Sequence, residues 1–240
     1  MSLLISILRF LVSTIVTAII AVVAFVTLPF NRNQKLYHRV GRVWARLLLR
    51  ICGVRVELHG AEHCAHGASV IYAANHASML DIPVVIASVP DDIRLVYKKE
   101  LEKIPVFGWG LKYGSYIGID RGRGTEARKS LEEAVDKIRR GASVLLFVEG
   151  TRTSDGKLQS FKRGAFNLAA RSGVPVIPLT INGTYALVPK HSLRIRSGTV
   201  HLHFDAPIRV EGAGSEREAE SVLMERVRSA IESHYVVQED

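Results

Sequence analysis

The sequence predicts an α/β domain with a largely parallel sheet flanked by helices, preceded by an N-terminal hydrophobic membrane anchor and a basic amphipathic helix. Three observations predict it. Short runs rich in β-branched residues alternate with helical stretches from residue 54 onward, as they do in βαβ units. Several of these runs are apolar throughout, as strands covered on both faces must be. The first 30 residues contain a long uncharged apolar run, whose length suits a lipid bilayer.

The apolar segment runs from residue 10 to residue 30 without a charge, and residues 3–8 extend it beyond Arg9. About 20 apolar residues cross a hydrocarbon core of ~30 Å at a rise of 1.5 Å per residue. A cleaved signal peptide is the alternative, but the run is too long for its hydrophobic region and no A-x-A-like cleavage site precedes the polar flank. We expect a retained anchor, either spanning or re-entrant.

A basic amphipathic helix is predicted over residues 34–51. One side carries apolar residues at helical spacing: Leu36, Val40, Val43, Trp44, Leu47, Leu48 and Ile51. Another side carries Arg39, Arg42, Arg46 and Arg50, which suits a helix lying among headgroups with its guanidinium groups on anionic lipid phosphates. The alternative is a core helix with solvated arginines, and the helix contains no acid to pair with them. The six basic residues between 31 and 50 predict that the body lies on the cytoplasmic face of the cell (inner) membrane.

The net charge of +9 and the sequence pI near 9.8 come almost entirely from the N-terminal quarter of the chain. Eight of the 32 basic residues precede the first acidic residue, Glu57, so the remainder carries 24 basic against 23 acidic residues. This placement argues against nucleic acid as a partner. A hydrophobic fraction of 48% excludes a disordered chain. Two cysteines, Cys52 and Cys64, exclude a disulfide framework and fit a reducing compartment.

The body reads as one unit, so we expect an anchor and interfacial helix over 1–53 and a single α/β domain over 54–240. Strands are predicted at 54–58, 69–74, 93–98, 115–120, 143–149, 174–181 and 199–204, and helices near 82–88, 125–140, 163–172 and 215–234. In open sheets of this kind the functional site lies at the carboxyl ends of the strands.

The strand at 69–74 leads directly into Asn75 and His76, and Asp81 follows His76 by five positions. Five residues rotate by ~140° on a regular helix, so the two side chains meet only if His76 lies in the turn before the helix. A carboxylate that accepts the Nδ1 proton leaves Nε2 as a general base. The alternative is a capping box, Ser78-x-x-Asp81, that begins a helix and leaves His76 incidental.

Three further strand ends each deliver a cation: Lys98, Arg121 and Arg152. Because carboxyl ends of parallel strands meet at one edge, we expect these cations near His76. Such a set holds a phosphate monoester through charge-assisted hydrogen bonds. The sequence has no G-x-S-x-G elbow, P-loop or dinucleotide fingerprint, so neither a covalent nucleophile nor a nucleotide site is indicated.

Four motifs in order resemble those of the glycerolipid acyltransferases, specifically the bacterial 1-acyl-sn-glycerol-3-phosphate (lysophosphatidate) acyltransferases. They are Asn75-His76 with Asp81, residues 119–121 (Ile-Asp-Arg), residues 147–152 (Phe-Val-Glu-Gly-Thr-Arg) and residues 174–178 (Val-Pro-Val-Ile-Pro). Residues 98–101, 104–109 and 161–164 agree as well, so the resemblance covers roughly 55–210.

The resemblance implies transfer of a fatty acyl group from acyl-ACP or acyl-CoA to the free sn-2 hydroxyl of lysophosphatidate, which gives phosphatidate. His76 would be the base and Asp81 would orient it, with no acyl-enzyme, no metal and no cofactor beyond the thioester co-substrate. The substrate-binding residues would be Lys98, Arg121, Glu149, Gly150, Thr151 and Arg152. The cations among them would hold the phosphate, Glu149 and the Gly150 backbone would line the glycerol pocket, and residues 174–178 would line the acyl or thioester site. Acyl carrier protein and anionic lipids would be partners.

Two positions depart from the family pattern. Val148 stands where proline is common, and Gly118 stands where a bulky residue is common. Gly118 is expected to open space near the phosphate-binding segment, so another lyso-lipid acceptor, such as lyso-ornithine lipid, is an alternative substrate. A non-enzymatic membrane protein that binds anionic lipid is the alternative from a different class.

Histidines form two further groups. His59, His63, Cys64 and His66 offer a zinc-like spacing, but no second ligand pair completes a tetrahedral site, so we expect a solvated loop. His201 and His203 share one face of a strand, where we expect partly exposed residues. The sequence leaves the acyl chain length and the oligomeric state open.

Overall fold

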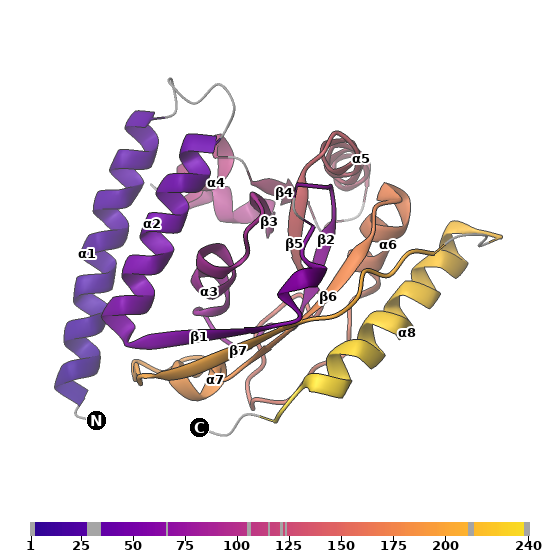
Figure 1. Ribbon diagram of the computed structural model, residues 1–240. Coiled ribbons are helices and arrows are strands. Elements are labelled where there is room, and N and C mark those ends of the chain that lie inside the picture. Colours follow the sequence, from indigo (N-terminus) through magenta and orange to yellow (C-terminus); the bar gives the residue numbers. More distant parts are fainter. Residues whose placement is uncertain are drawn as a thin grey trace.

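A seven-stranded sheet forms the centre of the molecule, in the order β1-β7-β6-β2-β5-β3-β4 (Figure 1). The computed structural model describes residues 3–27, 35–65, 67–104, 107–114, 116–120, 122, 124–210 and 214–237. The strands are β1 (Val54–His59), β2 (Ile71–Ala74), β3 (Ile93–Lys98), β4 (Ile117–Ile119), β5 (Ser143–Phe147), β6 (Val176–Asn182) and β7 (Gly198–Phe204). All seven predicted strands form.

The sheet is parallel at every strand pair except β6–β7, which is antiparallel. The predicted α/β class with a largely parallel sheet is therefore confirmed. The order places β2 in the middle, between β6 and β5, so the carboxyl end of β2 is flanked on both sides by parallel strand ends. This is where a parallel sheet ordinarily holds a ligand.

The helices are α1 (Leu3–Thr27), α2 (Lys35–Cys52), α3 (Asp81–Ser88), α4 (Phe107–Tyr113), α5 (Thr125–Arg139), α6 (Arg163–Ser172), α7 (Thr184–Leu187) and α8 (Glu216–His234), with 3-10 segments at Ala61–His63 and Lys99–Lys103. The predicted helices α3, α5, α6 and α8 begin and end within one residue of expectation. The short elements α4 and α7 and the two 3-10 segments were not predicted, because they lack an apolar period of their own.

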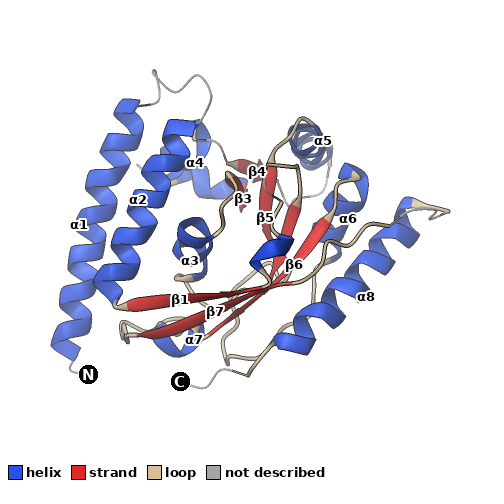
Figure 2. Cartoon of the chain, viewed as in Figure 1, coloured by secondary structure: helices blue, strands red, loops and turns tan. Residues whose placement is uncertain are grey.

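Two hydrophobic cores lie on the two faces of the sheet (Figure 2). One face packs on α2 and α3 through buried residues that include Tyr72, Leu145 and Ile177. The other face packs on α5, α6 and α8 through their immediate neighbours in sequence, such as Ile71 and Val144. Adjacent residues thus enter opposite cores, which explains why these strands are apolar throughout.

Helix α1 is long and apolar enough to cross a membrane. It packs side by side with α2 (Figure 1), and Trp44 Nε1 donates to Thr17 Oγ1 across the pair at 3.0 Å. A stripe at helical spacing faces away from α2: Leu4, Leu8, Leu11, Ile15, Ile19, Val22 and Val26 are all more than half exposed. An exposed apolar stripe of this length is typical of a lipid-facing helix.

The N-terminal end of α1 contacts the body. Arg9 Nη2 donates to Ser197 Oγ at 2.8 Å and Arg9 Nη1 donates to the Ile195 carbonyl at 3.2 Å. The backbone N–H of Ile195 in turn donates to Ser6 Oγ. These contacts hold the beginning of α1 against the segment that precedes β7.

One arginine of α2 also departs from expectation. Arg42 does not extend toward solvent or lipid, because its Nη2 donates to the Pro90 and Asp91 carbonyls and lies 3.5 Å from Asp92 Oδ1. The acid that the helix itself lacks is supplied by the loop after α3, and Arg42 therefore docks α2 onto the body. No such contact was visible in the sequence, because residue 92 lies 50 positions away.

A single residue, Gly53, joins α2 to β1. Its φ is +69°, a conformation that glycine adopts without strain. A Cβ at this position would lie 2.6 Å from Ser197 Oγ, and the Gly53 carbonyl accepts from the N–H of Gly198. Both the left-handed turn and the close approach of β7 require glycine here.

Candidate active site

The candidate site begins at the carboxyl end of β2. Asn75 follows the strand and is 1% exposed. Its Nδ2 donates to the Ile181 carbonyl at 2.9 Å, and its Oδ1 accepts from the Ile181 N–H at 2.7 Å. The side chain thus continues the pairing between β2 and β6 beyond their backbones, and it fixes where the chain leaves the sheet.

His76 lies in the turn and Asp81 is the first residue of α3. His76 Nδ1 is 2.7 Å from Asp81 Oδ2, the short contact expected of a charge-assisted pair. The Asp81 side chain is fully buried, whereas 15% of the His76 side chain is exposed. With Nδ1 directed at the carboxylate, Nε2 is the ring nitrogen left to face a substrate.

The Asp81 carboxylate also organises the turn. Its Oδ2 accepts from the N–H groups of Ala77 and Ser78 at 2.7 and 2.9 Å. The N-cap of α3 is Leu80 and has no side-chain cap bond, and Ser78 Oγ instead donates to the Val188 carbonyl and accepts from Leu80 N–H. The reciprocal capping box considered from the sequence is therefore not formed, and one carboxylate serves both the turn and the imidazole.

The last residue of β5, Phe147, packs against the catalytic candidate. Its ring centroid lies 3.8 Å from that of His76 and the two planes are inclined by 14°. Phe147 belongs to the motif at residues 147–152, and the sequence alone assigned it no contact. Its register opposite Ala74, two residues before His76, is the signal that places it there.

Glu149 is buried and both of its oxygens accept backbone N–H groups. Oε1 accepts from His76 at 2.6 Å and Oε2 accepts from Gln159 at 2.7 Å. Burial raises the pKa of Glu149, and the two backbone hydrogen bonds act in the opposite direction. Glu149 therefore joins the end of β5 to the His76 backbone, a contact that spacing along the chain does not show.

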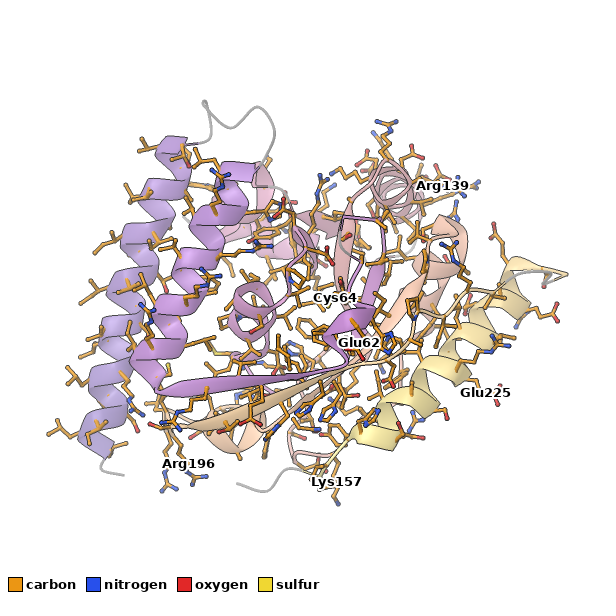
Figure 3. The ribbon with its side chains drawn as sticks, in the orientation of Figure 1. Glu62, Cys64, Arg139, Lys157, Arg196 and Glu225 are labelled. Carbon is orange, nitrogen blue, oxygen red and sulfur yellow. The ribbon has the colours of Figure 1, made fainter. Side chains whose placement is uncertain are left out.

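The remaining motif residues form the loop after β5. Gly150 has a φ of +73° and its N–H donates to the Phe147 carbonyl, while the Thr151 carbonyl accepts from Gln159 Nε2. The N–H of Thr153 donates to the His76 carbonyl at 2.9 Å, so this loop and the His76 turn are directly joined. Figure 3 labels Lys157 on the outer side of the loop.

The structure describes two of the three cations that were expected near His76, and these two differ in position and exposure. Lys98 ends β3, one strand beyond β5, and is half exposed with its Nζ 3.3 Å from Glu100 Oε1. Arg152 lies in the loop after β5 and is partly buried, and its carbonyl accepts from Lys190 Nζ. Arg121 lies outside the described residues. The contacts above bring together His76, Asp81 and Glu149, and they do not include the Lys98 and Arg152 side chains.

The space expected beside Gly118 is filled. A Cβ at Gly118 would lie 3.0 Å from Tyr97 OH and 3.0 Å from Glu102 Oε1. These two groups bond to each other, with Tyr97 OH donating at 2.9 Å, and burial together with Glu102 raises the pKa of Tyr97. The expectation that Gly118 opens a space is therefore wrong, because the neighbouring strand and 3-10 segment fill it.

The buried Asp81 and His76 lie at the carboxyl edge of a largely parallel sheet, and the only serine among their described contacts, Ser78, bonds to Asp81 through its backbone N–H. Such a pair can perform acid–base chemistry. The match to the family model described as Acyltransferase covers residues 55–182 and includes every element of this site. The chain belongs to the acyltransferase family.

Curated relatives agree with the family. The chain is 32% identical to the chloroplastic 1-acyl-sn-glycerol-3-phosphate acyltransferase BAT2 of Brassica napus, over 80% of its own length and 58% of the relative. It is 31% identical to the 1-acyl-sn-glycerol-3-phosphate acyltransferase of Pseudomonas aeruginosa, over 80% of its length and 75% of the relative. The chain thus spans a little over half the length of the Brassica napus relative.

A solved structure shares the fold over nearly the whole chain. The crystal structure of the 1-acyl-sn-glycerophosphate (LPA) acyltransferase PlsC from Thermotoga maritima superposes with a TM-score of 0.77 at 27% identity. The match covers 97% of this chain and 96% of that chain. The similarity therefore includes the N-terminal helices as well as the sheet.

Proposed function

We propose that this chain transfers a fatty acyl group from an acyl thioester, acyl-ACP or acyl-CoA, to the sn-2 hydroxyl of 1-acyl-glycerol-3-phosphate and so forms phosphatidate. The single observation that carries the proposal is the 2.7 Å contact of His76 Nδ1 with the buried Asp81. It directs Nε2 outward as a base. The names of the curated relatives and of the solved neighbour support the same acceptor.

The proposed chemistry needs one proton carrier. His76 Nε2 takes the proton of the sn-2 hydroxyl as the oxygen attacks the thioester carbonyl, and Asp81 stabilises the imidazolium that forms. When the tetrahedral intermediate collapses, the carbon–sulfur bond breaks and the imidazolium returns its proton to the thiolate. Because a thioester is already activated, this route requires neither a cofactor nor an acyl-enzyme.

The phosphate is assigned to the cations at the strand ends. Arg152 and Lys98 lie after β5 and β3, and Arg121 follows β4 in sequence. Guanidinium groups suit bidentate phosphate binding. Thr151 and the Gly150 backbone complete the acceptor side of the proposed site, and residues 174–178 line the acyl or thioester side. Glu149 is proposed to line the glycerol pocket while its two hydrogen bonds fix the His76 backbone.

Membrane attachment through α1 is part of the proposal, with the catalytic body on the cytoplasmic face of the cell membrane. The exposed stripe of α1 supports contact with lipid. The contacts of Arg9 with Ile195 and Ser197 favour a helix that stays in the leaflet next to the body over one that crosses to the far side. We expect Leu8→Lys with Ile15→Lys to reduce co-sedimentation with anionic vesicles, and Val237→Lys to leave it unchanged.

The decisive experiment compares wild type, His76→Ala and His63→Ala in detergent with an acyl thioester and lysophosphatidate. We expect His76→Ala to lose roughly 10³-fold in turnover while remaining folded, and His63→Ala, at an imidazole in the 3-10 segment after β1, to stay near wild type. Full activity of folded His76→Ala would overturn His76 as the base, whereas absence of turnover in the wild type would support the non-enzymatic, lipid-binding alternative.

A panel of acceptors tests the substrate assignment. Arg121→Ala and Arg152→Ala are expected to raise the KM for lysophosphatidate far more than the KM for the acyl donor. Arg140→Ala, an exposed cation after α5, is the matched control. A preference of the wild type for lyso-ornithine lipid over lysophosphatidate would overturn the acceptor and leave the His76 mechanism in place.

A further inference from the structure

One face of the paired strands β1 and β7 carries a row of histidines, and His203 at the end of the row stacks on His234 of α8. The two strands are parallel and in register, with Glu57 opposite His201 and His59 opposite His203. Alternate residues Val56, Val200 and Leu202 enter the core beneath. Period two therefore places all four polar side chains on the same outer face.

Three side chains in this row bring their ligand atoms together. His59 Nε2 lies 3.3 Å from His201 Nδ1, and Glu57 Oε2 lies 3.3 Å from the same nitrogen. The three ligand atoms all fall within 4.8 Å of one another. The ring of His59 is further held by stacking on His203, with centroids 4.4 Å apart and planes inclined by 12°.

These distances suit metal coordination better than hydrogen bonding. One imidazole nitrogen offers either one proton or one lone pair, so His201 Nδ1 cannot bond fully to both neighbours, and 3.3 Å is long for either bond. Two ligands at about 2.0–2.1 Å from a tetrahedral Zn²⁺ stand about 3.4 Å apart. Two imidazoles and one carboxylate are a ligand set typical of zinc and similar divalent ions.

We propose that Glu57, His59 and His201 form a surface site for Zn²⁺ or a similar divalent transition metal, joining β1 to β7 and leaving a coordination position to water. The site is separate from the His76 network, which lies at the carboxyl end of β2. The proposed site also differs from the zinc-like group around His59, His63 and Cys64 that the sequence offers. Cys64 is buried in the interior (Figure 3), and His63 belongs to the following 3-10 segment.

The test is titration of the full-length protein in detergent with ZnCl₂ in a buffer that does not chelate metals, followed by calorimetry. We expect one Zn²⁺ per chain. His59→Ala and His201→Ala should each weaken binding by at least about tenfold, since even loss of a group outside the first ligands costs that much. Both positions are at the surface, so the variants should remain folded, which circular dichroism checks.

His63→Ala is the matched control, because it removes an imidazole four residues from His59 without touching the proposed ligands. Its Zn²⁺ affinity should equal that of the wild type. Affinity unchanged in His201→Ala, or lost in His63→Ala as much as in His59→Ala, would overturn the assignment. A rise in melting temperature on adding Zn²⁺ to the wild type, absent in His201→Ala, gives an independent readout.

Discussion

The ring of Phe147 lies nearly parallel to the imidazole of His76, with centroids 3.8 Å apart. Asp81 fixes the imidazole from its edge and Phe147 fixes it from its face, so the ring is restrained in two directions. A general base works only when its lone pair is aimed at the proton it removes. The phenyl ring is therefore placed to position the proposed base, and we expect it to take no part in the chemistry.

Phe147→Leu should lower kcat by roughly tenfold and change the KM of either substrate little, because the imidazole gains freedom without losing Asp81. Steady-state kinetics with both substrates measures this split. Phe166→Leu is the control for lost packing, since Phe166 is fully buried, whereas Phe147 is partly buried, and it stacks on Phe161 in the other core. An equal loss in both variants would mean that Phe147 contributes packing alone.

Asp81→Asn should reduce turnover by about 10³- to 10⁴-fold, as the loss of the corresponding carboxylate does in hydrolytic triads. The amide cannot stabilise the imidazolium, and it offers two N–H groups where Ala77 and Ser78 already donate. The pH profile of kcat/KM distinguishes this from simple unfolding. A folded Asp81→Asn variant with a wild-type profile and rate would contradict the assignment.

Glu149→Gln should change the dependence of stability on pH. Burial raises the pKa of Glu149 above its ordinary value of 4.5, so ionisation is less favourable in the folded protein than in the unfolded chain. The stability it contributes is present below pH 4.5 and is lost as the pH rises through the folded pKa. The melting temperature of the wild type minus that of Glu149→Gln should therefore fall as the pH rises above 4.5. Exposed Glu132→Gln should show no such slope.

Gly118→Ala should destabilise the protein by about 1 kcal/mol, because its Cβ meets the Tyr97 hydroxyl and Glu102 at 3.0 Å. Chemical denaturation measures the change. Gly164→Ala is the control in α6, where a Cβ meets nothing within 4 Å and alanine favours the helix. A neutral Gly118→Ala variant would show that Tyr97 and Glu102 shift without cost.

The secondary structure was predicted well because apolar residues in the body recur with the regular spacing of strands and helices. The apolar strands and the helices at 125–140 and 163–172 are readable from residue type alone. The strand order and the reversed direction of β7 relative to β6 were not predictable, since they depend on pairing between strands that are distant in sequence. The docking of Arg42 on residues 89–92 and the stacking of Phe147 on His76 join segments that are distant in sequence, and no local pattern encodes them.

The site was predicted in part for the same reason. His76 and Asp81 are close in sequence, so a turn geometry could be deduced for them. Glu149 reaches the His76 backbone only because β2 and β5 are neighbours in the sheet, which residue spacing does not specify. The row formed by Glu57, His59 and His201 likewise depends on the parallel register of β1 and β7.

Because the single residue Gly53 links α2 to β1, no longer loop separates this helix from the sheet. Gly53, Arg9 and Arg42 are all bonded to the body, so these contacts set the position of α1 and α2 relative to His76. With α1 in the membrane, as proposed above, the fold then sets the height of His76 above the bilayer. An acceptor must then present its hydroxyl at that height. The protein would therefore select a lyso-lipid by the depth at which it lies in the bilayer as well as by the chemistry of its headgroup.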